Sequence, residues 1–165
     1  MATRRKNPLR TAGTQLFVLN HRTNELFEVG CLTSMGEISS PKQLEDSGCL
    51  RDLVDRQSIV GTSAGSTSIG VRFDHREEVN FKLFEAYKND DELTFALGFP
   101  QFGADGKQVH PDDAEVPELD SQNPDAPEIV FGGDRVYLLF DGQLTDFPIS
   151  VNRKAYFDMT IPVTI

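Results

Sequence analysis

The last eleven residues alternate between apolar side chains and mostly polar ones, and this alternation constrains the fold more than any other feature. The apolar positions are Ala155, Phe157, Met159, Ile161, Val163 and Ile165. Successive side chains of a strand point to opposite faces, so the pattern predicts a long strand with one buried face. Pro162 has no N–H for a ladder, so we expect it to face an edge or a bulge. Shorter alternating runs at 67–73, 93–99 and 147–151 predict further strands.

Two turn signals add detail to this mainly β interpretation. Residues 15–20 and 25–29 flank four residues, 21–24, and this arrangement predicts a hairpin. A further strand is expected over 135–140, and Asp141-Gly142 after it predicts a tight turn.

One segment has the periodicity of a helix. From Arg76 to Lys88 the apolar positions that share one face are Val79, Leu83, Ala86 and Tyr87. Asp74 and Glu77 have the spacing of a capping box, which predicts where the helix begins. Phe81 and Phe84 project away from the apolar face. Either flanking loops cover these two rings, or the helix has a second buried face at a subunit contact.

Two long stretches, 40–60 and 100–127, show no sustained period and are expected to be irregular loops. Loops of this length are uncommon in compact domains and are usually functional or disordered. Residues 105–134 carry nine acids and one base, whereas residues 1–10 carry Arg4, Arg5, Lys6 and Arg10 without an acid. We therefore expect a basic N-terminal arm (1–12) followed by a single domain (13–165).

Composition excludes several classes of function. The formal net charge of −10 argues against a protein that grips nucleic acid through its phosphates. No apolar run approaches the roughly 18–20 residues of a membrane-spanning helix, and no apolar segment follows the basic start as in a secretory signal. Cys31 and Cys49 are expected to be reduced, mostly buried thiols in a protein made in a cytosol.

The chemical motifs are weak. Gly61-Thr62-Ser63-Ala64-Gly65 matches the nucleophile elbow of hydrolases, but that motif needs a helix after the serine and here a strand is expected. His110 with Asp112, Asp113 and Glu115 lacks the spacing of a calcium loop and is interpreted as a solvated acidic segment. We therefore expect no enzyme, no metal and no cofactor.

The order of the expected elements resembles the tail tube proteins of long, non-contractile-tailed bacteriophages of the lambda type. The segments that carry the resemblance run from about residue 12 to the C-terminus; they are Ala12-Gly13-Thr14 before the first strand, Gly36-Glu37-Ile38-Ser39 before a long loop, 63–68 before a strand and the helix, Gly98-Phe99-Pro100, and the closing Thr160-Ile161-Pro162-Val163-Thr164. The 100–127 insertion is longer than the family pattern, and no additional C-terminal immunoglobulin-like domain follows.

The resemblance implies a β-sandwich or barrel-like core with one flanking helix. It implies that the chain is a virion protein assembled in the cytoplasm of the host bacterium. Six copies would form a ring, and rings would stack into a tube through which the viral DNA leaves without specific binding. The implied partners are further copies of the chain and other tail proteins (tape measure, tail terminator and tail tip), with no membrane.

Three sets of residues follow as hypotheses. Contacts between rings are expected at Arg4, Arg5, Lys6, Arg10, Leu44, Glu45, Asp46, Leu50, Arg51, Asp52 and Asp55. Phe81 and Phe84 are expected at a subunit contact, and Asp74, Asp146 and Asp158 are the acids expected to face the lumen. The alternatives are another ring-former of the same fold (a tail terminator, a connector or a type VI secretion tube protein) and a β-sandwich module that binds a host surface.

Overall fold

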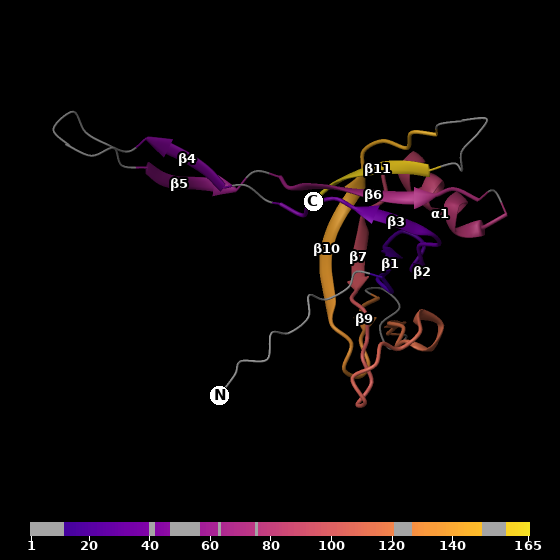
Figure 1. Ribbon diagram of the computed structural model, residues 1–165. Helices are drawn as coiled ribbons and strands as arrows, with labels where there is room; N and C mark the ends of the chain where they lie inside the picture. The colour runs from indigo at the N-terminus through magenta and orange to yellow at the C-terminus, as the bar shows by residue number, and fades with distance from the viewer. Residues whose placement is uncertain are drawn as a thin grey trace, which may run out of the picture. The chain divides into compact units, whose positions relative to one another are not determined.

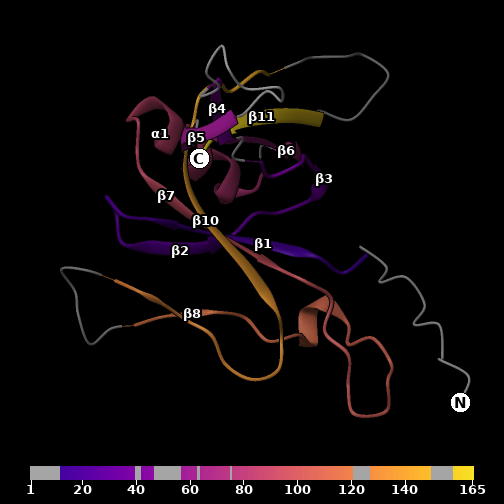
Figure 2. The same cartoon turned by 90° about the vertical axis from the view of Figure 1, so that its left-hand side faces the viewer.

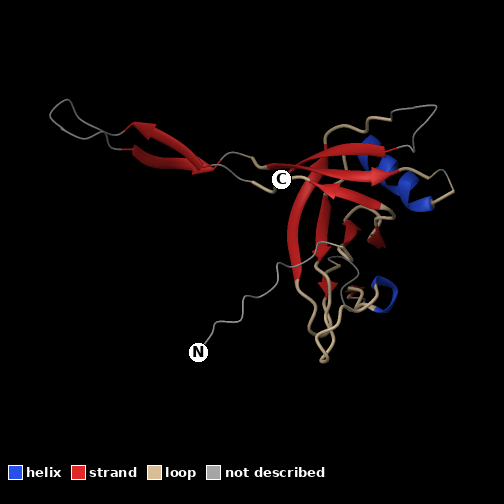
Figure 3. Ribbon diagram, in the orientation of Figure 1, coloured by secondary structure: helices blue, strands red, loops and turns tan. Residues whose placement is uncertain are grey.

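The computed structural model describes residues 12–39, 42–46, 57–62, 64–74, 76–120, 127–149 and 158–165. Antiparallel strands dominate these residues and one α-helix accompanies them, which confirms the mainly β fold (Figures 1 and 3). They group into two compact units: Met1–Val29 with Glu92–Asp141, and Gly30–Asp91 with Gly142–Ile165. Strand β10 (Tyr137–Leu144) contributes its first residues to the first unit and its last residues to the second. No described helix is long and apolar enough to cross a membrane.

The first unit is built around strand β1 (Gln15–Asn20). On one side β1 pairs antiparallel with β2 (Glu25–Glu28), and on the other it pairs antiparallel with β7 (Leu93–Gly98). The hairpin predicted at 15–29 is confirmed, and Asn24 in its turn has a positive φ of 55°. All six residues of β1 are buried, so both faces of the strand are covered, and its backbone is paired on both sides.

The acidic segment of the first unit is folded where the structure describes it, so the prediction of a plain solvated loop is wrong there. Strand β8 (Glu118–Leu119) pairs with β9 (Ile129–Val130), and β8 also contacts β2 (Figure 2). A short 3-10 helix, Pro111–Asp113, precedes the buried Ala114. A few apolar side chains anchor a segment whose overall composition is acidic.

The second unit contains the predicted C-terminal strand, β11 (Asp158–Thr164). It lies between β6 (Ser66–Arg72) and the end of β10, and β6 pairs in turn with β3 (Leu32–Met35). Met159, Ile161 and Val163 are buried, so the alternation is confirmed from residue 158 onward, while residues 155–157 lie outside the described part.

Pro162 lies in β11 beside the point where regular pairing with β10 ends. That pairing covers only Val163 and Thr164, opposite Leu144 and Gln143, so on the side toward β10 the proline lies at the edge of the ladder, as predicted. Its carbonyl accepts a hydrogen bond from the Thr145 N–H at 3.1 Å on this side. The proline nitrogen faces the same side and cannot return that bond, whereas the ladder with β6 loses no bond.

The predicted helix is α1 (Glu78–Lys88), and it buries Leu83 and Ala86 as expected, together with Asn80. Its start was predicted incorrectly: Glu77 is the N-cap and makes no capping bond with its side chain. Asp74 instead accepts from the Glu77 N–H and from Asn80 Nδ2 through its carbonyl, at 3.0 and 2.8 Å. The carboxylate of Asp74 is occupied by Arg76 rather than by the helix.

Further predictions are corrected. Residues 40–60 were expected to be irregular, but β4 (Lys42–Asp46) and β5 (Gln57–Thr62) form an antiparallel hairpin.

Strand β10 runs straight through Asp141-Gly142, where a turn was predicted. The strand expected at 147–151 is absent from its described residues, 147–149, since Phe147 is buried by aromatic packing without a ladder. Cys31 is exposed rather than buried, and Cys49 lies outside the described residues.

Candidate assembly surfaces

Helix α1 and the segments beside it carry five aromatic rings, which we call the aromatic face: Phe73 in contact with Phe81, and Phe84, Tyr87 and Phe147 in contact with one another. Ring centroids are 6.2 Å apart for Phe73 and Phe81 and 5.4 Å apart for Phe84 and Phe147. Neighbouring segments of the second unit therefore cover these rings in part. Phe81 nevertheless stays 50% exposed and Phe84 39% exposed. An exposed aromatic cluster of this kind is typical of association surfaces.

The three acids predicted to face the lumen all lie in the second unit, in different electrostatic settings. The Asp74 carboxylate pairs with Arg76 (Oδ2 to Nη2, 2.7 Å), and this hydrogen bond raises the pKa of Arg76 above its usual value. Asp158 pairs with Arg72 (Oδ1 to Nε, 3.0 Å). Asp146 is exposed and accepts the N–H of Phe147 at 2.8 Å. The paired arginines therefore compensate part of the negative charge of Asp74 and Asp158.

The residues predicted at contacts between rings lie mostly outside the described part of the chain: Arg4, Arg5, Lys6, Arg10, Leu50, Arg51, Asp52 and Asp55. The structure brings Leu44, Glu45 and Asp46 together on β4, with backbone partners on β5. Whether these residues form the contact stays a prediction.

Arg135 organises the first unit, and the sequence reasoning missed it. Its guanidinium donates from Nε to the Phe99 carbonyl at 2.9 Å and from Nη2 to the Gly98 carbonyl at 3.2 Å. Its Nη1 donates to Gln15 Oε1 and to the Glu115 carbonyl, both at 2.7 Å. The side chain is only 6% exposed. Arg135 thus joins β1, β7 and the acidic segment through hydrogen bonds. Its position at the start of an apolar strand was the one sequence feature that could have indicated a buried role.

Tyr137 lies beside this arginine. The Arg135 guanidinium carbon is 5.5 Å from the centre of its ring, and the Tyr137 hydroxyl donates to the Glu115 carbonyl at 2.9 Å. Burial raises the pKa of the Tyr137 hydroxyl, and Arg135 opposes that shift in part. The phenol therefore stays neutral at pH values where an exposed tyrosine would ionise.

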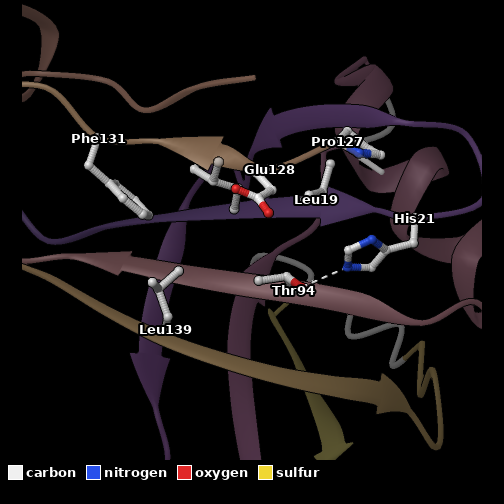
Figure 4. A pocket seen from close by; sticks show the side chains of 8 residues that line it. Leu19, His21, Thr94, Pro127, Glu128, Phe131 and Leu139 are labelled. Carbon is white, nitrogen blue, oxygen red and sulfur yellow. Dashed lines mark hydrogen bonds between the residues drawn. The ribbon is translucent and has the colours of Figure 1, made fainter. Parts of the chain in front are cut away.

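A groove of about 290 Å³ opens in the first unit between the sheet and the segment that contains β9. We call it the β9 groove. Its lining residues, drawn in Figure 4, are Leu19, His21, Thr94, Pro127, Glu128, Ile129, Phe131 and Leu139. Apolar side chains make up most of the lining, and Leu139 is 49% exposed.

One end of the β9 groove carries a short polar chain. His21 Nε2 lies 2.7 Å from Thr94 Oγ1, and the Thr94 hydroxyl donates to Asp141 Oδ1. In acyl-transfer triads the imidazole lies between the hydroxyl and the carboxylate. Here the hydroxyl is in the middle and its proton is directed at the carboxylate, so this arrangement does not activate Thr94 as a nucleophile.

The weak motifs of the sequence gain no chemical support. Gly61 and Thr62 end strand β5, and β6 begins at Ser66, so a strand rather than a helix follows the Gly-x-Ser-x-Gly motif; Ser63 itself lies outside the described residues. The ring nitrogen Nδ1 of His110 accepts the Asp112 N–H at 3.3 Å. Among the residues that the structure describes, no group of three His, Cys, Asp or Glu side chains is placed to hold a metal ion.

Aromatic and aliphatic side chains are exposed in both units, and such side chains mark surfaces of association where they form contiguous patches. Comparison with known proteins identifies the family. The chain matches the model of the lambda-like phage tail tube family over residues 7–165, and it belongs to that family. It is also 23% identical, over 165 residues, to Structural protein 3 of Pseudomonas phage PAJU2. The aligned region covers 98% of this chain and 92% of that relative. The resemblance found in the sequence is confirmed, and the chain has a structural role in a phage tail.

Proposed function

We propose that this protein assembles into six-membered rings, and that these rings stack into a tail tube through which the viral genome passes into the host. The observation that carries the proposal is the family match, which extends over nearly the whole chain. Tube assembly would take place in the cytoplasm of the infected bacterium, with the tape measure, tail terminator and tail tip proteins as further partners.

The strand pairing supports self-association. Within the part of the chain that the structure describes, β3 pairs with β6 alone. The other side of β3 therefore presents a row of backbone N–H and C=O groups at the edge of the sheet. Such edges are usually blunted in monomers because they template association, and a head-to-tail ring of identical subunits closes them by symmetry.

The charge of the chain supports a conduit for DNA. A net charge of −10 lets the genome slide through a bore without binding to its wall. We propose that Asp74, Asp146 and Asp158 contribute to the lining of that bore. Asp146 would contribute most, because it is exposed and the other two carboxylates each face an arginine.

Two further surfaces complete the proposal. The aromatic face, through Phe81 and Phe84, would lie at the contact between neighbouring subunits. The basic arm and the β4–β5 hairpin, with its connecting residues, would contact the next ring, as predicted for Arg4, Arg5, Lys6, Arg10, Leu44, Glu45, Asp46, Leu50, Arg51, Asp52 and Asp55.

Negative-stain electron microscopy of the concentrated, purified protein tests this function. Long hollow tubes with six-fold symmetry are expected. Single rings that never stack would point instead to a terminator or connector, and monomers under all concentrations and salt conditions, with the other tail proteins present, would overturn the proposal.

Serine variants test the aromatic face separately. Phe84→Ser is expected to reduce the amount of tube, whereas Phe102→Ser is the matched control, since Phe102 is 43% exposed and lies in the other unit. Circular dichroism shows whether each variant is folded. Equal tube yields from the two folded variants would refute a subunit contact at Phe84.

A further inference from the structure

We infer that the β9 groove receives the basic N-terminal arm of a second copy of this chain. This inference rests on the proposed function, because it requires copies of the chain to associate. It assigns a receiving site among the described residues of the first unit.

The floor of the groove is apolar and its rim is acidic. Leu19, Phe131 and the half-exposed Leu139 form apolar parts of the lining, and Figure 4 shows the carboxylate of Glu128 among them. Asp141 is next to this lining, because it accepts a hydrogen bond from the Thr94 hydroxyl. The cations on these elements are Arg22, in the same turn as His21, and Arg135, whose guanidinium is buried and already bonded to four oxygens.

The arm has the complementary chemistry. Residues 6–10 read Lys-Asn-Pro-Leu-Arg, so one apolar pair, Pro8-Leu9, is flanked by a cation on each side. A groove of about 290 Å³ is at the small end of the clefts that hold ligands, and it fits a leucine and its neighbours rather than a helix. Leu9 would contact Leu139 and Phe131, while Lys6 and Arg10 would approach Glu128 and Asp141.

Chain length indicates which copy supplies the arm. Ala12 precedes Gln15, the first residue of β1. The carbonyl of Ala12 accepts a hydrogen bond from Gln108 Nε2, which holds this part of the chain in place. Leu19 is four residues further along β1, about 13 Å from Gln15 at the rise of a strand. Leu9 precedes Ala12 by three residues, which span at most about 11 Å. Leu9 of the same copy therefore falls short of the Leu19 end of the groove, which favours an arm supplied by a second copy.

Photo-crosslinking in the full-length protein tests the inference. Benzoylphenylalanine replaces Leu9, copies grown on heavy and light nitrogen are mixed before assembly, and cross-linked peptides are identified by mass spectrometry. The expected result is heavy-to-light linkage from position 9 to peptides that contain Glu128, Phe131 or Leu139. Linkage only within one copy, or linkage between copies only at other surfaces, would overturn the inference.

Matched variants on adjacent positions sharpen the test. Leu139→Asp should lower the linkage between copies about tenfold, because it places a charge on the apolar floor. Leu138→Asp is the control, since Leu138 is 40% exposed and points to the opposite face of β10. Equal losses in both variants would contradict a specific site at Leu139.

Microscopy of the same samples separates the two proposals. Tubes in which position 9 is linked elsewhere would refute the groove as the receiving site and leave the tail tube function standing. Absence of tubes in the unmodified protein would refute the tube function, whatever the cross-links show.

Discussion

Replacing Arg135 with methionine should be among the most destabilising single changes in the first unit. Methionine keeps much of the length and the apolar stem but removes all the donors of the guanidinium. The Glu115 carbonyl retains the Tyr137 hydroxyl, whereas the Gly98 and Phe99 carbonyls and Gln15 Oε1 each lose the donor that Arg135 provides. Arg135 is 6% exposed, so water does not readily replace it.

The magnitude follows from these three acceptors. A buried polar group left without its partner costs about 1–3 kcal/mol, and removing a buried charge recovers part of that loss. We therefore expect Arg135→Met to lower the free energy of unfolding by about 2–4 kcal/mol, a large share of the 5–15 kcal/mol typical of a folded protein. Arg135→Lys, which retains the charge without the planar set of donors, should lose less.

Urea denaturation measures this effect. The Arg135→Met midpoint should fall by about 1 M, and hydrogen exchange should increase first in residues 98–119. Lys107→Met is the control, because the Lys107 side chain is 85% exposed in the same segment, and it should change stability by less than about 0.5 kcal/mol. An Arg135→Met loss as small as the control would refute the role assigned to Arg135.

Three further predictions concern other residues. Because burial raises the pKa of Tyr137, the unfolded chain releases this proton first, so the contribution of Tyr137 to stability should be constant up to the usual pKa of about 10 and decline above it. Ultraviolet difference titration of wild type against Tyr137→Phe should show the late-titrating phenol, and its absence would contradict the shift. Asn80→Asp should lower the free energy of unfolding, measured with heat or urea, by about 3–5 kcal/mol, because it puts a carboxylate into a site with no exposed surface and removes the Nδ2 donor. A loss smaller than that of Asn80→Ala would refute this reasoning. Gly142→Ala should lower the free energy of unfolding by about 1–3 kcal/mol, because the new Cβ would lie 2.7 Å from the Thr164 carbonyl oxygen. An unchanged melting temperature would show that β10 and β11 move apart at this point without loss of stability.

Local patterns in the sequence predicted several of the elements. The hairpin at 15–29 was expected from its four-residue connection, and strands β6, β7 and β11 and helix α1 were expected from alternation or helical spacing; the structure has each of them. These elements bury their apolar positions in any well-packed arrangement, so local pattern is sufficient to find them.

Elements that depend on distant partners were predicted less well. Gly142 carries a turn signal in the sequence, but it lies inside β10 because a glycine permits the close approach of the β11 backbone. Phe147 fits an alternating pattern, yet it is buried against Phe84 and Tyr87 without a strand. In both cases the neighbour that decides the outcome is far away in the sequence.

The sequence by itself determined the mainly β class, the single helix, the excess of acid and the likeness to phage tail tube proteins, because alternation, charge and the order of segments are properties of the linear chain. Only the tertiary structure decided that the acidic segment packs on the sheet around Arg135, and that Leu19, Glu128 and Leu139 line one groove. A buried arginine and a groove both depend on which side chains meet across long separations, and that is set by packing and hydrogen bonding rather than by local pattern.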